Sequence, residues 1–267
     1  MKLKGKIAIV TGASRGVGKA IARRLGREGA KIVVVGKTET PHPTLPGTIH
    51  ETVAEVKSQG GEAIAVGMDV RDDHHVEALA KKTKEHFGRI DILIHNAGAI
   101  WLRPFLETPM KRFDLVMDVN VRAAYSLMQA VVPIMEENGG GHILTMSPKL
   151  SARHIVPCAA YNISKMGMTL LVEYLREEFR EKNIAINTLW PVTLIESEAT
   201  RHFQMGSPKD WRSPTILADA VLEIVSRPPS QFSGNAVSDE EILRSAGVTD
   251  FSKYRADPAA EPKPLWK

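Results

Sequence analysis

The amino-acid sequence predicts an α/β protein with a single main domain, in which helices cover both faces of a doubly wound, seven-stranded parallel sheet. Two observations support this prediction. Short runs of β-branched residues alternate with longer segments of helical periodicity, which is the pattern of a parallel sheet covered by helices. Each apolar run has the length of a strand and is bounded by Gly, Pro, Asn or Asp, the residues that form turns.

The seven predicted strands follow one another along the chain. They cover Ile7–Val10, Ile32–Val35, Ala63–Val66, Ile90–His95, His142–Ser147, Ile184–Leu189 and Asn235–Ser238. Between them, apolar residues recur at the spacing of one helical face, so the intervening helices are expected to lie on the sheet. Two such faces are formed by Val17, Ile21 and Leu25, and by Val76, Leu79, Thr83 and Phe87.

Three segments interrupt the alternation. Residues 38–48 contain Pro41, Pro43 and Pro46, which exclude a helix interior and predict a loop after the second strand. Residues 192–214 form a longer and less regular connection, as active-site lids do. We therefore predict a domain over residues 1–240 that includes this loop and this lid, and a C-terminal extension over residues 241–267.

The composition excludes several classes of protein. The chain has 267 residues and one cysteine, Cys158, which excludes an intrachain disulfide and fits a reducing compartment. No apolar run reaches the ~18 residues that cross a bilayer, and the first strand follows Met1 too closely for a signal peptide, so we expect a cytoplasmic protein without a membrane span. The net charge is +4, but Lys and Arg alternate with Asp and Glu along the chain and do not form a cluster. This argues against nucleic acid as a partner. The histidines show no metal-ligand spacing, so no catalytic metal is expected.

A glycine-rich turn follows the first strand directly and opens an amphipathic helix. It reads TGASRGVG over residues 11–18. Glycines permit positive φ and let the backbone approach a pyrophosphate, which the amides and the dipole of a helix N-terminus stabilise. The spacing differs from the common GxGxxG fingerprint, so a purely structural turn is the alternative. The residues expected to bind a dinucleotide here, in a Rossmann-type domain, are Gly12, Ser14, Arg15, Gly16, Val17 and Gly18.

The end of the second strand predicts which nicotinamide coenzyme binds. Proteins that bind NAD place a carboxylate there for the ribose 2′-hydroxyl, and such an acid repels the 2′-phosphate of NADP. This chain reads Val35-Gly36-Lys37-Thr38 and has no acid at that point. We therefore predict NADP(H) as the cofactor, with Lys37 and Arg15 binding the phosphate. The alternative is that both are solvated surface cations.

Tyr161 and Lys165 lie one helical turn apart, so both project from the same face of a helix. A pair with this spacing arises by chance in many chains, and its position makes it informative. The helix follows the fifth predicted strand, and Ser147 stands at the carboxyl end of that strand, where open α/β sheets bind their ligands.

Together these residues resemble the short-chain dehydrogenase/reductase family, and the resemblance runs over nearly the whole chain. The matching motifs, in chain order, are the TGxxxGxG turn, Asp69-Val70, Asn96-Ala97-Gly98, Asn120, Ser147, and Tyr161 with Lys165. A narrower resemblance is to the branch of hydroxysteroid dehydrogenase-like proteins and citronellol/citronellal dehydrogenases. It rests on residues 37–47 (KTETPHPTLPG), Ser147-Pro148, Leu189-Trp190-Pro191 and Ser238-Asp239-Glu240.

The resemblance implies a catalytic role for four residues. Tyr161 would act as general acid in carbonyl reduction and as general base in alcohol oxidation, and Lys165 would favour its phenolate and bind the nicotinamide ribose. Ser147 would bind the substrate oxygen, and Asn120 would anchor a water for proton relay. The alternatives are that Ser147 only ends a strand and that Asn120 only kinks a helix.

The resemblance also implies coenzyme contacts beyond the glycine-rich turn; for Asp69 the alternative is that it caps the end of a strand. These contacts are Asp69, Val70, Asn96, Ala97, Gly98, Tyr161, Lys165, Pro191 and Thr193. The chain departs from the family pattern at three places. His95 precedes Asn96 where a second Asn is usual, Pro148 follows Ser147, and Pro191 keeps the turn after the sixth strand without the usual glycine. Cys158 lacks a partner base and is expected to be a small packing residue.

The loops expected to face the substrate are apolar, which favours a terpenoid, fatty-acyl-derived or steroid-like substrate. Their residues are Ile100, Trp101, Leu150, Ile155, Val156, Leu194, Ile195, Phe203, Met205 and Trp211. The predicted function is the NADP-dependent interconversion of an apolar alcohol and its carbonyl compound. Reduction of enoyl or ketoacyl substrates is one alternative, and a non-catalytic NADP-binding regulatory protein is another. Surplus apolar residues on the predicted helices Met110–Met135 and Ala159–Arg180 favour a homodimer or homotetramer.

Overall fold

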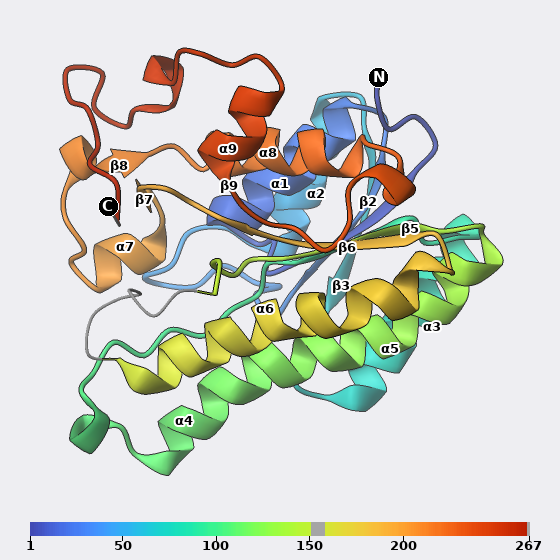
Figure 1. Ribbon diagram of the computed structural model, residues 1–267, viewed down its shortest axis with the longest axis horizontal. Helices are drawn as coiled ribbons and strands as arrows, with labels where there is room; N and C mark the ends of the chain where they lie inside the picture. Colours follow the sequence, from blue (N-terminus) through green and yellow to red (C-terminus); the bar gives the residue numbers. More distant parts are fainter. Residues whose placement is uncertain (151–157, 266–267) are drawn as a thin grey trace.

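The computed structural model describes residues 1–150 and 158–265. Its centre is a seven-stranded parallel sheet with the strand order β3-β2-β1-β4-β5-β6-β9 (Figure 1). The strands are β1 (Ile7–Thr11), β2 (Lys31–Gly36), β3 (Glu62–Gly67), β4 (Ile92–His95), β5 (Gly141–Thr145), β6 (Ile184–Trp190) and β9 (Ala236–Ser238). The predicted fold class is thus confirmed, and the strand ends agree with the predicted ones within two residues.

The sheet is apolar on both faces because neighbouring residues of a strand point to opposite sides. In β1, Ala8 and Val10 belong to one buried cluster and Ile9 to the other. In β2, Val34 and Val33 divide in the same way. A continuous apolar strand therefore needs a cover on each face, which is why the strands read as unbroken β-branched runs.

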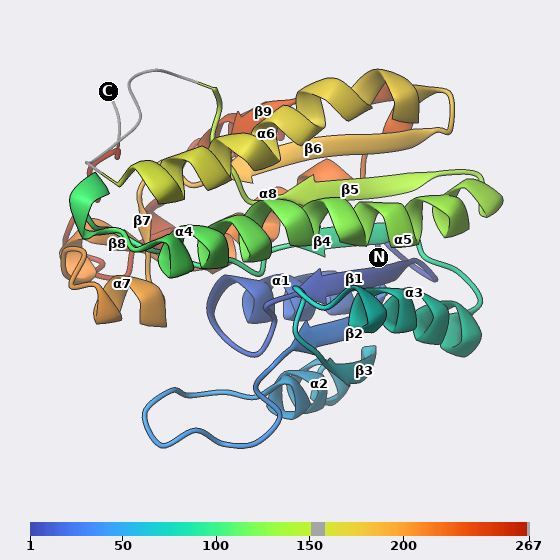
Figure 2. The ribbon, with the colours of Figure 1, turned by 90° about the horizontal axis from the view of Figure 1, so that it is seen from below.

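Helices supply both covers. One face packs against α1 (Gly16–Arg27), α2 (Ile49–Ser58), α8 (Thr215–Val225) and α9 (Asp239–Ser245). The other packs against α3 (Asp73–Phe87), α5 (Ala123–Glu137) and α6 (Ala159–Arg180), and α4 (Met110–Met117) lies beside α6 (Figures 1 and 2). No helix in the described residues is long and apolar enough to cross a membrane.

The helix predicted over Met110–Met135 is confirmed as one helical run over residues 110–137, but it is not regular. Between α4 and α5, residues Asp118–Arg122 form a π-helical turn, which holds one more residue than an α-helical turn. Asn120 lies in this turn and is fully buried. Periodicity alone does not reveal such an interruption, because the apolar residues on either side still have helical spacing.

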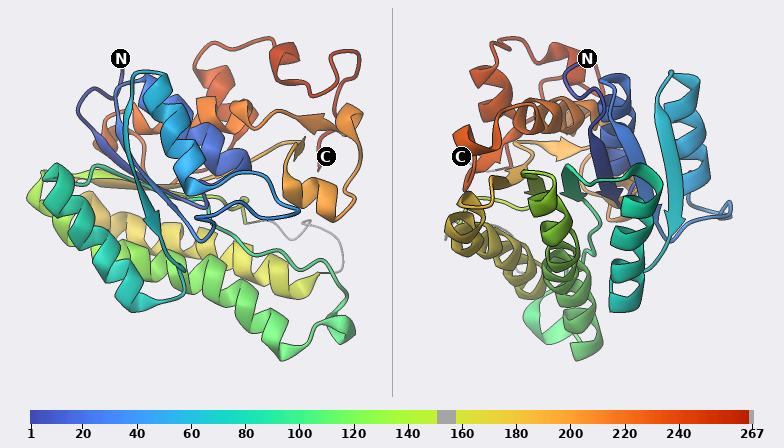
Figure 3. Two further views of the ribbon diagram at one scale, coloured as in Figure 1. Left: turned by 180° about the vertical axis from the view of Figure 1, so that it is seen from behind. Right: turned by 90° about the vertical axis from the view of Figure 1, so that its right-hand side faces the viewer.

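The three irregular segments lie around the carboxyl ends of the strands. The proline-containing segment has no helix or strand before α2, whose N-cap is Thr48, and it projects from the body of the molecule (Figure 2). The segment after β6 contains a two-stranded sheet of β7 (Leu194–Ile195) and β8 (Trp211–Arg212), with α7 (Glu198–His202) between them. Beyond α9, the chain returns to this small sheet (Figure 3).

Candidate active site

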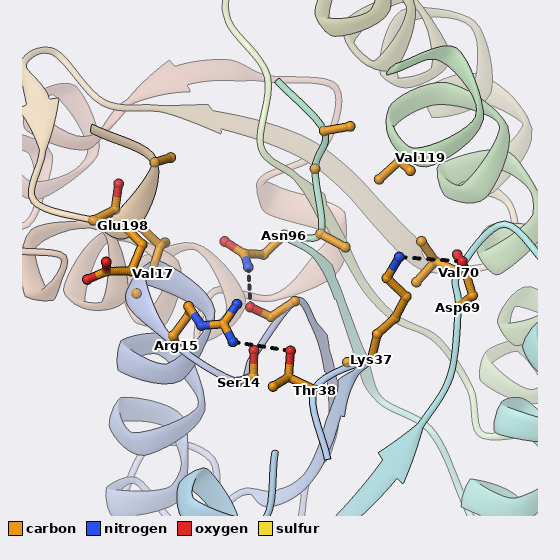
Figure 4. A pocket seen from close by; sticks show the side chains of 18 of the residues that line it. Ser14, Arg15, Val17, Lys37, Thr38, Asp69, Val70, Asn96, Val119 and Glu198 are labelled. Carbon is orange, nitrogen blue, oxygen red and sulfur yellow. Dashed lines mark hydrogen bonds and ion pairs between the residues drawn. The ribbon is translucent and has the colours of Figure 1, made fainter. Parts of the chain in front are cut away.

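Two adjoining cavities open at the carboxyl ends of β1, β2 and β4, where the parallel strands direct their following loops. The first is a groove of about 520 Å³, and its floor is the glycine-rich turn after β1 (Figure 4). The groove contains most of the predicted coenzyme contacts: Gly12, Ser14, Arg15, Gly16, Val17, Lys37, Asp69, Val70, Asn96, Ala97 and Gly98. Parallel strands bring these distant segments to one edge of the sheet, as expected for an open α/β fold.

The floor of the groove is built by backbones that touch. Gly12 has a φ of +65°, and a Cβ there would lie 2.8 Å from the Cα of Ala97. Gly18 does not line the groove, but a Cβ on it would lie 2.4 Å from the carbonyl oxygen of Gly12. The Asn96 side chain donates from Nδ2 to the carbonyls of Thr11 at 3.0 Å and Gly12 at 3.1 Å. Only glycine fits at positions 12 and 18. The backbone amides of the first turn of α1 have no partner within the helix and face the groove.

One end of the groove carries two cations (Figure 4). Arg15 donates to the carbonyls of Pro46 at 2.7 Å and Gly47 at 3.2 Å, and to the hydroxyl of Thr38 at 3.1 Å. The loop of residues 38–48 therefore fixes the orientation of the Arg15 guanidinium. Lys37 is 65% exposed, and its Nζ lies 3.6 Å from a carboxylate oxygen of Asp69.

Asp69 is held mainly by another residue. Arg71 donates from Nε to Oδ1 at 3.0 Å and from Nη2 to Oδ2 at 2.6 Å. These hydrogen bonds hold the pKa of the Asp69 carboxyl well below its usual range. The carboxylate therefore stays charged at the edge of the groove. The Arg71 amide donates to Oδ1 of Asp69 at 3.1 Å and the Asp72 amide donates to the Asp69 carbonyl at 3.2 Å, which also fits the alternative that Asp69 shapes a strand end.

The second cavity is apolar, has a volume of about 500 Å³, and shares Val17, Asn96, Ser197 and Ala199 with the groove. Of the predicted substrate-facing residues, it contains Ile100, Leu194, Ile195 and Met205; of the predicted coenzyme contacts, it contains Val17, Asn96, Tyr161, Pro191 and Thr193. Sequence reasoning missed Leu102, Met146, Trp190, Leu217 and Leu265, which also line it. These residues come from five separate segments. Of these, the end of β6 carried a sequence signal, the Leu189-Trp190-Pro191 motif.

Other predicted wall residues lie elsewhere. Trp211 is buried under the lid, where its indole N–H donates to the Met205 carbonyl at 2.7 Å. Trp101 stacks on the guanidinium of Arg112, with 4.7 Å between the ring centroid and Cζ. Leu150 is exposed. Phe203 packs edge-to-face on the ring of His202. Ile155 and Val156 lie outside the described residues.

Tyr161 and Lys165 lie in the first two turns of α6, close to both cavities. Tyr161 lines the apolar cavity. Lys165 is buried, and its ammonium lies 5.9 Å from the centroid of the Tyr161 ring and donates to the Met146 carbonyl at 2.9 Å. A Cβ built on Gly98 would lie 3.5 Å from that ammonium, so the charge sits directly behind the groove. Burial lowers the pKa of Lys165 to about 8 and raises the pKa of the Tyr161 phenol.

Asn120 clamps the loop that follows β4. Its Oδ1 accepts from the Ala99 amide at 2.8 Å, and its Nδ2 donates to the Ala99 carbonyl at 3.0 Å and to the Ser164 hydroxyl at 2.8 Å. The π-helical turn directs this side chain at the loop. Asn120 thus ties the groove to α6 at Ser164, one residue before Lys165, and both N–H donors of its side chain are engaged in doing so.

Ser147 differs from the expectation. Its side chain is buried, and its hydroxyl lies 2.6 Å from the Thr188 hydroxyl and accepts from Thr169 at 2.9 Å. β5 ends at Thr145, and Met146, not Ser147, lines the apolar cavity in the described part of the chain. Met146, the first residue after β5, therefore faces the apolar cavity, and Ser147 faces the core. The structure brings Tyr161, Lys165 and Asn120 together but does not bring the Ser147 hydroxyl to the cavity.

His95 replaces the usual asparagine and is fully buried beside this site. Its Nε2 lies 3.2 Å from the Val119 carbonyl, so this nitrogen must carry the proton. Its Nδ1 then accepts from the Thr11 hydroxyl, 3.2 Å away. His95 thereby connects β1, β4 and the π-helical turn. Burial, and secondarily the charge of Lys165, lower the pKa of His95 to about 4.

Two other sequence expectations concern cysteine and metals. Cys158 is buried, burial raises the pKa of its thiol, and its Sγ lies 3.8 Å from Oδ1 of Asn162. A protonated thiol is a poor nucleophile. Among residues 1–150 and 158–265, no three His, Cys, Asp or Glu side chains come close enough together to hold a metal ion.

Comparison with known proteins identifies the family. The sequence model of the family described as short chain dehydrogenase matches residues 6–205. The chain belongs to the short-chain dehydrogenase/reductase family. Hydroxysteroid dehydrogenase-like protein 2 of Xenopus tropicalis is 42% identical over 96% of this chain, which spans 62% of that relative's length.

Solved structures of the dehydrogenase family agree with the fold. A short chain dehydrogenase of Mycobacterium thermoresistibile matches with a TM-score of 0.91 and 39% identity, over 99% of this chain and 95% of that one. A metagenomic short-chain oxidoreductase in complex with NADP has a TM-score of 0.76 and 28% identity, over 89% and 98% of the two chains. A 7α-hydroxysteroid dehydrogenase complexed with NADH has a TM-score of 0.78 and 31% identity, over 88% and 93%.

The buried imidazole predicts a pH-dependent stability. The folded pKa of His95, about 4, lies below its ordinary value of 6.5, so the unfolded chain binds the proton first as pH falls. The stability that this group contributes is therefore complete above pH 6.5 and declines by up to about 3 kcal/mol as pH falls toward 4. We expect His95→Asn to remove this loss. Urea unfolding at pH 7 and pH 4.5 measures it, and an equal difference between wild type and variant at both pH values would contradict it.

The position of Ser147 predicts a mild effect of its loss. We expect Ser147→Ala to lower the free energy of unfolding by about 1–2 kcal/mol, because Thr188 and Thr169 lose a buried partner. We expect kcat to fall by less than tenfold, because the hydroxyl lies outside the cavity. Steady-state kinetics and denaturant unfolding measure the two effects. A loss of kcat beyond a hundredfold with unchanged stability would contradict this and would indicate that Ser147 binds the substrate oxygen.

Proposed function

We propose that this member of the short-chain dehydrogenase/reductase family is an NADP(H)-dependent oxidoreductase that interconverts an apolar alcohol and its carbonyl compound. The observation that carries the proposal is the position of Tyr161 and Lys165, where a groove with a cationic end adjoins an apolar cavity. A candidate proton donor thus lines the site for an apolar ligand, and the ammonium beside it lies behind the site for a polar one.

The groove fits a dinucleotide. Its floor leaves no space for a Cβ at Gly12 or Gly18, the first-turn amides of α1 are available to an anion, and its volume is about 520 Å³. Gly12, Ser14 and Gly16 would hold the pyrophosphate, and Lys165 would reach the nicotinamide ribose past Gly98. When bound, the coenzyme supplies or accepts the hydride at the substrate carbon.

The proton is the task of Tyr161. In reduction, its phenol donates a proton to the carbonyl oxygen as that oxygen gains negative charge; in oxidation, the phenolate takes the proton back. Burial raises the pKa of this phenol, which keeps it protonated and able to donate at neutral pH. The ammonium of Lys165, 5.9 Å from the ring centroid, acts in the opposite sense and stabilises the phenolate that each reduction leaves.

The cationic end of the groove favours NADP(H). Arg15, Lys37 and Thr38 present two positive charges and a hydroxyl there, and β2 ends in Gly36 without a carboxylate. Two acids, Asp69 and Glu198, also line the groove, and the Asp69 charge is directed at Arg71 and Lys37. A 2′-phosphate bound at Arg15 and Lys37 would pair with two cations. The related structure in complex with NADP agrees with this choice, and the one complexed with NADH shows that the family also uses the other coenzyme.

The apolar cavity favours a hydrophobic substrate. Its walls are mainly aliphatic and aromatic, with Tyr161 as the group that titrates. Hydroxysteroid dehydrogenase-like relatives are consistent with this class. A panel of terpenoid aldehydes, acyl-carrier substrates and ketosteroids, each assayed by NADPH oxidation, separates alcohol/carbonyl chemistry from enoyl or ketoacyl reduction. Coenzyme binding without turnover of any of them would favour a regulatory protein.

The exposed apolar side chains of the long helices support self-association. Tyr125 of α5 and Ile163, Leu170 and Tyr174 of α6 are exposed. We propose a homodimer or homotetramer formed through these helices, because an apolar helical surface of this kind is stabilised by burial against a second copy. Light scattering that shows a monomer at micromolar concentration would contradict it.

Removal of the phenolic oxygen tests the mechanism. We expect Tyr161→Phe to lower kcat more than a hundredfold and to leave coenzyme affinity within about threefold, because the ring remains and only the proton donor is lost. Steady-state kinetics and calorimetric titration with NADPH give the two values. A variant that retains more than a tenth of wild-type kcat would refute the role of this tyrosine.

Removal of one cation tests the choice of coenzyme. We expect Lys37→Ala to lower kcat/KM for NADPH by about 10–100-fold and for NADH by less than threefold, because a charged hydrogen bond to the phosphate contributes about 1.5–3 kcal/mol. Lys82→Ala, an exposed lysine on α3, is the matched control. A wild-type protein that prefers NADH, or equal losses with both coenzymes, would contradict the assignment.

A further inference from the structure

The apolar cavity has one wall that comes from the end of the chain. We propose that residues 255–265, the C-terminal strap, close the mouth of this cavity, and that Leu265 selects substrates with an extended apolar chain. The inference rests on the proposed function and names a feature of its substrate. The family model ends at residue 205, so the strap lies outside the part of the chain that the family at large shares.

The strap is bound to the lid by main-chain hydrogen bonds. The Ser213 amide donates to the Tyr254 carbonyl at 2.6 Å, and the Ala256 amide donates to the Trp211 carbonyl at 3.1 Å. At the other end, the Leu265 amide donates to the Val192 carbonyl at 2.8 Å. The C-terminal part of the chain therefore runs back over β8 and reaches the turn after β6 (Figures 1 and 3). Its ends are fixed to two segments that line or support the cavity.

A buried cation secures the strap. Arg212 of β8 has 3% of its surface exposed, which is costly for a charge that lacks partners. Its Nη1 lies 2.5 Å from Glu240 at the start of α9, and its Nη2 lies 3.5 Å from Glu261 of the strap. Arg255 also pairs with Glu261. Among the described residues, Glu261 is the one acid of the strap that pairs with the Arg212 guanidinium. It lies four positions before Leu265.

Leu265 presents apolar surface at the cavity. Its backbone is anchored, and yet its side chain is 42% exposed and lines the cavity together with Leu194 and Trp190. An anchored leucine with uncovered surface gains stability when an apolar ligand covers it. Tyr161 lies on the wall of the same cavity. On this proposal, a substrate whose carbonyl meets Tyr161 reaches Leu265 only with its distal carbons, so short substrates gain nothing from this residue.

The consequence is a preference that grows with chain length. Each methylene removed from water contributes about 0.8 kcal/mol, or a few-fold in kcat/KM, as long as a wall receives it. Leu265 supplies that wall for the distal carbons. Truncation of this side chain should weaken binding of long substrates and leave the proton transfer at Tyr161 untouched, so the effect belongs to KM and not to kcat.

The test uses linear aldehydes from four to twelve carbons with NADPH and the full-length protein. In wild type, we expect kcat/KM to rise with chain length. In Leu265→Ala, the ratio of kcat/KM for twelve carbons to that for four carbons should fall at least fivefold, through KM. Leu106→Ala, a leucine 94% exposed on the short helix before α4, is the matched control and should keep the wild-type ratio.

A second variant tests the strap without touching the cavity. Glu261 is exposed, so Glu261→Gln should fold normally while it weakens the link to Arg212. We expect the same loss of chain-length preference, of about two- to fivefold, with kcat within twofold. Hydrogen exchange should show faster exchange of residues 258–265 in this variant, and slower exchange in wild type when dodecanol is added.

The outcomes separate the two proposals. If wild type turns over none of these linear aldehydes, the panel of terpenoid aldehydes and ketosteroids decides on the proposed function, and the exchange data decide on the strap. Protection of residues 258–265 by dodecanol supports the strap, and its absence overturns it. If wild type is active and Leu265→Ala keeps the wild-type chain-length ratio, the strap has no role in substrate selection, whatever the reaction is.

Discussion

The site depends on the close contact between the glycine-rich turn after β1 and the loop after β4. Asn96 joins the two backbones by donating to the carbonyls of Thr11 and Gly12, and the missing Cβ atom of Gly12 lets the Cα of Ala97 approach. This contact forms the groove floor and carries Gly98 to the ammonium of Lys165. A side chain larger than hydrogen in this contact would push the two strand ends apart and open the site from below.

Burial and charge are distributed unequally between the two cavities, and that inequality suits a hydride transfer. The groove has cations and free amides, whereas its neighbour is lined by aliphatic and aromatic groups. Lys165 lies behind the groove and beside Tyr161 of the apolar cavity, and burial lowers its pKa to about 8. A buried cation there would stabilise a phenolate on Tyr161 more than a solvated one would, because water screens less of its field. The apolar neighbour thus strengthens the polar chemistry.

Much of this arrangement could be predicted from the sequence, because strands of a parallel sheet are local in sequence and their carboxyl ends share one edge. The runs around Ile9 and Val33 predicted the sheet, and the motifs that follow each strand predicted the groove. The orientation of Ser147 could not be predicted, since one residue more or less after β5 exchanges the cavity for the core. The π-helical turn and the approach of Leu265 to the cavity also escaped prediction, because neither has a local periodic signal and the second joins residues far apart in the chain.

The turn that contains Asn120 sets how α4 and α5 are rotated relative to each other. A π-helical turn is an α-helix with one residue inserted, and it persists only where the gain offsets the lost regularity. Here the inserted residue directs an amide into the loop after β4. Deletion of one residue between Asp118 and Arg122 would join α4 and α5 into a regular helix and rotate everything before the deletion by about 100° about its axis. The irregular turn therefore sets which face α4 presents to α6, and a regular helix in its place would present another.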